Sequence, residues 1–195
     1  MTELKSVAAL ERIASERCEV ATCNTLVAAN VATLEQLAGT LAEVSDRFYA
    51  DQPDEKTSSM GMHVRHIIEF YLAFLIPCEE GSDHPKGVLC YDARERDLRY
   101  ETDRSLAINE IAAIVARLKA LPRQDTTLHV AAIVDPEAPP IAMQTTRDRE
   151  LFHVLDHAIH HMALIKLVGE KQGLSLALDF GLANSTKTNA KAKAN

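Results

Sequence analysis

The sequence predicts an all-α fold, a four-helix bundle with one short β-hairpin between the third and fourth core helices. Three features lead to this prediction: long segments with apolar residues every three or four positions, polar connections containing Pro or Gly, and one segment in which apolar residues alternate. The chain has 195 residues, which is the size of a single domain. We expect that domain to span residues 1–186, and residues 187–195 to form a disordered basic tail.

The N-terminal quarter of the chain is expected to be helical. Residues 2–50 contain no proline, and their apolar side chains recur at helical spacing. An unbroken helix of this length would be about 70 Å long, which exceeds the diameter of a small domain. We therefore expect a break near Cys23–Thr25, with residues 1–23 as a helical extension outside the core.

Two further core helices are expected in the middle of the chain. Ser58 or Ser59 can cap the second core helix, which ends near a proline. Thr102 or Asp103 can cap the third in the same way. The connection between them, residues 79–97, is expected to be an ordered loop.

The hairpin and the last core helix follow. Segment 128–145 begins with alternating apolar residues, continues with turn-forming residues and ends with residues that favour strands. This pattern is typical of a β-hairpin. Thr145 with Asp148 three residues later indicates a capped helix start. We expect this helix to run to about Lys171 and to stop at Gly173.

Charge and composition exclude several classes of partner. The 21 Lys and Arg residues against 28 Asp and Glu give a net charge of −7, so binding to nucleic acid is not expected. No apolar stretch approaches the roughly 20 residues of a membrane span. The chain begins without an export signal and its cysteines show no C-x-x-C spacing, so we expect a cytoplasmic protein without a membrane partner.

The histidines are the informative residues. On the last helix, His157 and His161 stand one turn apart on the core side, which is a geometry that chelates divalent metals, whereas His160 faces solvent. His63 and His66 share a face of the second core helix, so either can add a third ligand. Histidines that only hydrogen-bond within a core are the alternative. Six of the eight histidines lie in these two segments: His63, His66, His153, His157, His160 and His161.

Two histidine-containing segments carry a resemblance to a known family: residues 60–70 (MGMHVRHIIEF) and residues 149–161 (RELFHVLDHAIHH). Through these segments the chain resembles the DinB/YfiT-like superfamily of four-helix metal-dependent enzymes. Weaker similarity lies at residues 91–96 and 180–183, and the likeness extends from about residue 25 to residue 186.

The resemblance implies a three-histidine site for a divalent metal, with Zn or Ni as the expected ion. The implied ligands are His66, His157 and His161, with His63 as the alternate first ligand. Many relatives continue after the last histidine with Arg-Gly-Gln, whereas this chain has Met162-Ala-Leu164.

Three protein nitrogens and an open position are typical of a catalytic rather than a structural metal site. The resemblance implies a thiol-dependent transferase or a hydrolase that acts on a small molecule, with a thiolate or a water activated at the metal. A low-molecular-weight thiol is one expected partner. The alternative is a non-catalytic, stress-related binding or scaffold bundle with a vestigial or structural site.

Further candidates lie near these histidines. Glu69, one turn after His66, can accept a hydrogen bond from a ligand imidazole or act as a base; the alternative is a surface carboxylate near Arg65. A homodimer is expected, because small helical bundles with broad apolar faces often pair. Three loop residues are candidates for the substrate pocket, unless ion pairs hold them in a solvated loop: Tyr91, Asp92 and Arg94.

Overall fold

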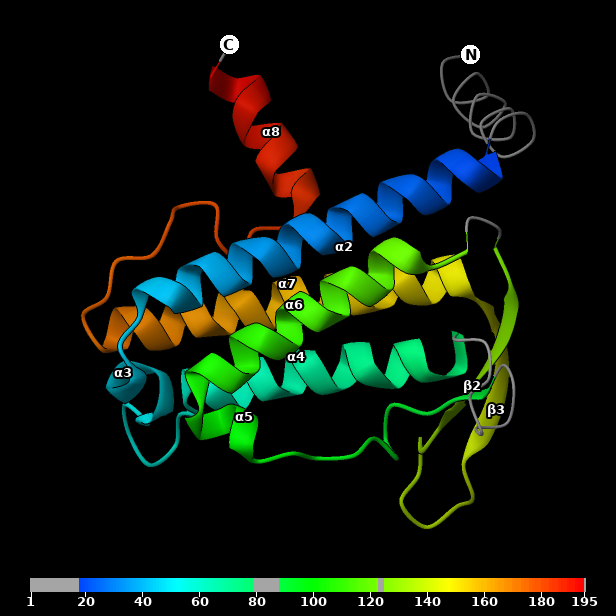
Figure 1. Cartoon of the computed structure of the whole chain (residues 1–195), viewed down its shortest axis with the longest axis horizontal. Helices are drawn as coiled ribbons and strands as arrows, with labels where there is room; N and C mark the ends of the chain where they lie inside the picture. Colours follow the sequence, from blue (N-terminus) through cyan, green and yellow to red (C-terminus); the bar gives the residue numbers. More distant parts are fainter. Residues whose placement is uncertain (1–17, 79–87, 123–124, 195) are drawn as a thin grey trace.

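The computed structural model describes residues 18–78, 88–122 and 125–194, and most of them are helical (Figure 1). The prediction of a mainly helical fold is confirmed. Within these residues, no helix combines the length and the apolar composition that crossing a membrane requires. The long helices are α2 (Cys18–Glu43), α4 (Met60–Leu75), α6 (Arg104–Ala120) and α7 (Arg147–Lys171), and the shorter ones are α3 (Asp46–Ala50), the 3-10 turn η1 (Ile76–Cys78), α5 (Arg99–Thr102) and α8 (Asn184–Ala194).

The four long helices pack in a closed ring. Helix α2 contacts α6 and α7, and α4 contacts the same two helices (Figure 1). Fully burying one large aliphatic side chain contributes about 1.5–3 kcal/mol, so the shared core holds the ring together. Each of the four helices supplies fully buried side chains to this core: Leu34, Leu37, Val64, Ile68, Ile114, Leu118, Leu151 and Ile165.

Helix α2 is unbroken at Cys23–Thr25, so the predicted break is wrong there. The Thr25 hydroxyl donates to the carbonyl four residues earlier at 2.8 Å, and a side chain satisfied in this way need not end a helix. The chain breaks later, after Glu43, where Ser45 caps α3. Most of the expected extension, residues 1–23, lies outside the described residues.

The two middle helices begin at residues that the sequence offered as caps. The Ser59 hydroxyl accepts from the backbone N–H of Met62 and starts α4. The Asp103 carboxylate accepts from the backbone N–H of Leu106 and starts α6. Side-chain capping satisfies an N–H group that the helix itself cannot bond, which is why the helix starts were visible in the sequence.

The expected hairpin is present and belongs to a three-stranded sheet. Strand β2 (Thr127–Ala132) pairs antiparallel with β3 (Ile141–Thr146). Strand β1 (Val88–Leu89) pairs parallel with β2, so the described part of the expected loop at residues 79–97 includes a strand. The sheet lies at the end of the helices where α4 ends and α7 begins (Figure 1).

The cap of helix α7 lies one residue later than predicted. The cap is Thr146, and the hydroxyl of Thr145 donates instead to Glu150 at 2.7 Å. Both threonines could cap a helix chemically, so their neighbours in the fold decided between them. The end of α7 at Lys171 agrees with the prediction, and Gly173 follows with a φ of 81°, a left-handed conformation that favours glycine.

The C-terminal segment differs from the expected disordered tail. Helix α8 spans Asn184–Ala194. Alanine and lysine, which recur after residue 186, are strong helix formers. The polar composition therefore did not indicate the local structure of this segment.

The start of α4 lies so close to α5 that only glycine fits at position 61. Gly61→Ala is expected to destabilise the chain, because the added Cβ would lie 2.0 Å from the carbonyl oxygen of Glu101. Overpacking of this kind costs about 1 to 3 kcal/mol. Urea denaturation followed by far-UV circular dichroism measures the change.

Gly39→Ala is the matched control. Gly39 is exposed on α2, and an added Cβ meets no atom within 4 Å. Replacing a glycine within a helix by alanine is expected to stabilise the chain by about 0.5–1 kcal/mol. Equal stability of the two variants would contradict the close approach of α4 to α5.

Candidate metal centre

Helices α4 and α7 bring three imidazoles together. His66 lies on α4, and His157 and His161 lie one turn apart on α7; one ligand nitrogen of each ring is within 4.8 Å of the other two. The ring centroid of His66 lies 5.0 Å from that of His157 and 4.4 Å from that of His161. The structure therefore assembles the three residues that the resemblance implies as ligands.

His157 supplies a test of whether these residues fit a metal. Its Nε2 atom is buried and has no hydrogen-bond partner among the described residues. Leaving such an atom unsatisfied costs about 1–3 kcal/mol, and a metal ion would satisfy it. Imidazole nitrogens suit Zn and Ni, so the donor set fits the expected cation.

His63, the alternate first ligand, lies beside the group of three rather than in it. Its Nδ1 is 3.1 Å from Nδ1 of His161, so one ring donates a hydrogen bond to the other. If His161 donates, its Nε2 keeps an unprotonated lone pair. Ligand histidines typically use their second nitrogen in this way.

Burial keeps the three rings neutral. Desolvation, followed by the charge of Arg94, lowers the pKa of His66 to about 4. Desolvation and neighbouring histidines lower the pKa of His157 to about 4 and that of His161 to about 3. Because neutral imidazole is the form that binds metals, the rings need lose no charge to act as ligands near neutral pH.

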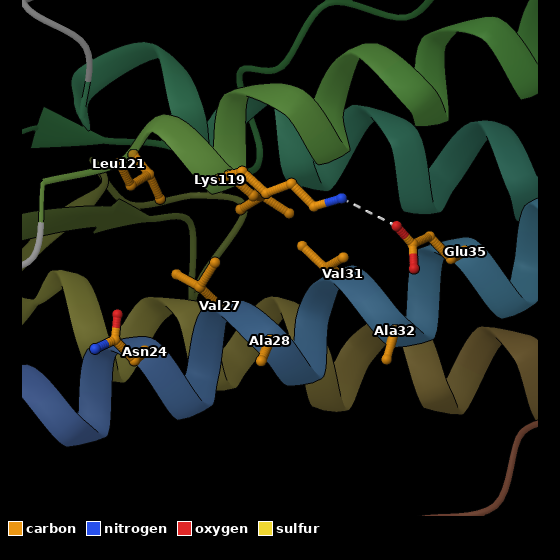
Figure 2. Close-up of a pocket in the computed structure, with 9 residues that line it drawn as sticks. Asn24, Val27, Ala28, Val31, Ala32, Glu35, Lys119 and Leu121 are labelled. Carbon is orange, nitrogen blue, oxygen red and sulfur yellow. Dashed lines mark hydrogen bonds and ion pairs between the residues drawn. The ribbon is translucent and has the colours of Figure 1, made fainter.

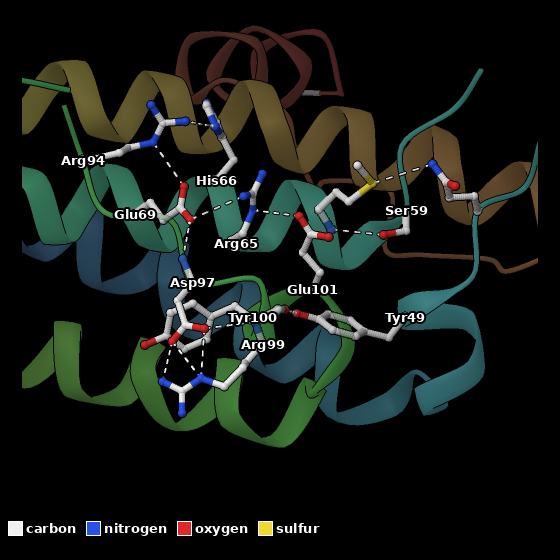
Figure 3. Close-up of polar contacts among 12 residues, drawn as sticks. Tyr49, Ser59, Arg65, His66, Glu69, Arg94, Asp97, Arg99, Tyr100 and Glu101 are labelled. Atoms are coloured by element: carbon white, nitrogen blue, oxygen red, sulfur yellow. Dashed lines mark hydrogen bonds and ion pairs between the residues drawn. The ribbon is translucent and has the colours of Figure 1, made fainter. Parts of the chain in front are cut away.

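Glu69 is buried within ion pairs, so the interpretation as a surface carboxylate is wrong. Only 1% of its side chain is exposed, and its Oε2 lies 3.2 Å from Arg94 Nε. Its Oε1 accepts from the backbone N–H of Asp97 at 3.2 Å and lies 3.7 Å from Arg65. Figure 3 shows this carboxylate between the two arginines. Through its described contacts, Glu69 positions Arg94, Arg65 and the backbone of Asp97.

Arg94 lies against a member of the histidine group. One guanidinium N–H donates to the carbonyl of Tyr91 at 2.9 Å, and another lies 3.0 Å from Nδ1 of His66 (Figure 3). The guanidinium also lies 5.0 Å from the centre of the Phe70 ring. Together with its ion pair to Glu69, these contacts hold Arg94 in one position.

Aromatic rings cover one side of the site. Phe70 stacks on His157, with ring centroids 4.0 Å apart, and on Tyr91, with centroids 4.9 Å apart. The Tyr91 hydroxyl donates to Glu150 at 2.9 Å, and burial, with the nearby Glu150 charge, raises the pKa of Tyr91. Tyr91 therefore borders the site with its ring while its hydroxyl is engaged elsewhere.

Two residues of the site, Phe70 and Glu150, were not predicted from the sequence. One loop residue, Asp92, lies elsewhere than the predicted substrate pocket. Phe70 follows His66 by four positions, and Glu150 precedes His157 by seven, so helical spacing could have identified both. Asp92 accepts a hydrogen bond from a backbone N–H of the β2–β3 connection at 2.9 Å. The described hydrogen bond of Asp92 therefore fastens the loop to the hairpin.

A separate groove of about 440 Å³ lies between α2 and α6 (Figure 2). An ion pair between Lys119 and Glu35, 3.1 Å apart, crosses its edge. The groove belongs to other helices than the histidines do, so it is distinct from the candidate metal centre. Its lining is mostly apolar: Asn24, Val27, Ala28, Val31, Ala32, Glu35, Leu118, Lys119 and Leu121.

Comparisons with known proteins show which family the chain is similar to. The family described as the DinB superfamily matches residues 29–165, a range that includes all three histidines. FK506-binding protein 5 of the fungus Rhizopus delemar is 38% identical over 102 residues. That alignment covers 51% of this chain and 26% of the fungal protein, so the chain spans about a quarter of the length of this curated relative.

Glu69→Gln is expected to destabilise the chain by about 2 to 3 kcal/mol, because it removes the charge that pairs with Arg94, whose side chain is only 11% exposed. Chemical denaturation measures the loss. Glu95→Gln, at an exposed position in the same segment, is the matched control and should change stability by less than about 0.5 kcal/mol. Equal losses would show that the buried ion pairs do not stabilise the fold.

Proposed function

The chain belongs to the DinB superfamily, and on that premise we propose that His66, His157 and His161 hold one divalent metal ion, either zinc or nickel. The observation that carries the proposal is the buried, unpartnered Nε2 of His157 within a group of three imidazoles. The ring formed by α2, α4, α6 and α7 is then the four-helix bundle of the family.

The number of protein ligands favours a catalytic site. Structural zinc sites are normally closed by four protein ligands, whereas catalytic sites keep one position open. Among the described residues, no cysteine or carboxylate joins the three histidines. This composition supports an open position.

We infer that the protein is a metal-dependent enzyme acting on a small molecule, either a thiol-dependent transferase or a hydrolase. Bound metal would lower the pKa of a thiol or a water at the open position and so supply a nucleophile near neutral pH. Phe70 and Tyr91, whose rings stack beside His157, limit the access of bulk water from their side. A small-molecule thiol and a homodimeric assembly are further parts of this proposal.

The neighbouring polar residues His63 and Glu69 have positioning roles. In the metal-binding form, His63 accepts a hydrogen bond from Nδ1–H of His161, which leaves Nε2 of that ring for the metal. Glu69 holds Arg94 and the backbone of Asp97, so it positions the neighbouring segment and has no assigned role as a base.

The test of metal binding uses the double variant His157→Ala/His161→Ala. Wild-type protein is expected to bind about one zinc or nickel ion per chain, because three neutral imidazoles are already assembled. The double variant is expected to bind almost none. Atomic emission of chelator-treated and reloaded protein measures the metal content.

His160→Ala controls for the loss of a neighbouring histidine, since His160 is exposed on the same helix. It is expected to keep the wild-type metal content. Circular dichroism verifies that each variant is folded. Equal metal content in wild type and double variant would overturn the assignment of the ligands.

The test of catalysis uses metal-loaded protein and two substrate panels. One panel combines low-molecular-weight thiols with electrophiles, and the other contains simple esters and amides. Turnover is expected in at least one panel for wild type and His160→Ala and is expected to be lost in the double variant. Stoichiometric metal without turnover in either panel would favour the non-catalytic binding or scaffold bundle.

A further inference from the structure

The contact between Arg94 and His66 determines which nitrogen of the ring carries a proton. Arg94 Nη2 lies 3.0 Å from Nδ1 of His66. A guanidinium has only donors, so Nδ1 of His66 must be the acceptor. The proton of the neutral ring is therefore on Nε2.

This arrangement conflicts with metal ligation by His66. A ligand nitrogen needs an unprotonated lone pair. Arg94 occupies the lone pair of Nδ1, and Nε2 carries the proton. His161 is the opposite case, because its partner His63 can accept a hydrogen bond and so leave Nε2 unprotonated.

The position of Arg94 is fixed by the fold. Its side chain is 11% exposed and pairs with Glu69, which is 1% exposed. It also donates to the carbonyl of Tyr91, and Glu69 accepts from the backbone of Asp97. Segment 91–97 is thus anchored to α4 by the same carboxylate that aims Arg94 at His66.

We propose that Arg94 competes with the metal for His66, so that metal binding requires the guanidinium to leave Nδ1. This inference rests on the proposed metal site and describes how metal binding at that site is regulated. Because Arg94 and Glu69 also anchor segment 91–97, metal occupancy is coupled to the position of that segment. A change that draws Arg94 away favours the loaded state.

Arg94→Gln tests the competition. A glutamine amide carries an oxygen that can accept from a protonated Nδ1, so His66 is released to bind with Nε2. Zinc binding to the full chain, measured by competition with a chromophoric chelator, is expected to tighten by about tenfold, the lower end of the range for partners of ligand histidines. Arg96→Gln, exposed in the same segment and equal in charge change, is expected to bind zinc like wild type.

A measurement on the wild-type protein does not depend on the folding of Arg94→Gln. Long-range ¹H–¹⁵N NMR distinguishes the two neutral forms of a histidine ring, and the absence of one signal set in His66→Gln identifies His66. Metal-free protein is expected to have the His66 proton on Nε2. Added zinc is expected to abolish that form.

The outcomes separate this inference from the proposed function. If wild type binds zinc and Arg94→Gln binds it equally or more weakly, Arg94 does not compete and the inference is wrong. A proton on Nδ1 of His66 in metal-free wild type overturns it as well. If neither wild type nor Arg94→Gln binds zinc, the proposed metal site itself fails, and the competition fails with it.

Discussion

The packing of α4 against α7 removes imidazole nitrogens from water, and each such nitrogen needs a hydrogen-bond partner or a metal. The site depends on this constraint. Nε2 of His157 has no partner among the described residues. His66 and His161 present their nitrogens to the same space, within 4.8 Å. Protonating any of these rings would place a charge where it is poorly hydrated, so burial holds them neutral. Neutral imidazoles that share one space can bind a common cation once each ring has a free lone pair.

The partners of the rings are chemically different, and this difference distinguishes the two helices. On α7, His161 has another imidazole as its partner, and an imidazole can accept as well as donate. On α4, His66 has a guanidinium, which only donates. One arrangement is compatible with metal ligation as it stands, whereas the other must change first. His161 can therefore bind a metal without rearrangement, whereas the availability of His66 depends on the loop that contains Arg94.

That loop is held by a buried carboxylate. The segment that contains Arg94 returns along α4 towards α5 (Figure 1), and Glu69 holds it through Arg94 and the backbone of Asp97. Arg65 extends the network to Glu101 on α5 with a separation of 2.9 Å. A carboxylate near a ligand histidine suggests a base when only the sequence is known. In the fold, the described contacts of this carboxylate are with arginines and a backbone N–H.

The sequence by itself determined what depends on local chemistry: most of the helical segments, the caps at Ser59 and Asp103, and the shared face of His157 and His161. These features need only neighbours within a turn or two of the chain. Only the tertiary structure decided which helix packs against α7 and which turns of the two helices lie side by side. This packing placed His66 rather than His63 in the group of three. Spacing could not make that choice, because both residues lie on one face of α4. Long-range packing also buried Glu69 and brought Arg94 to His66, contacts that join residues more than twenty positions apart.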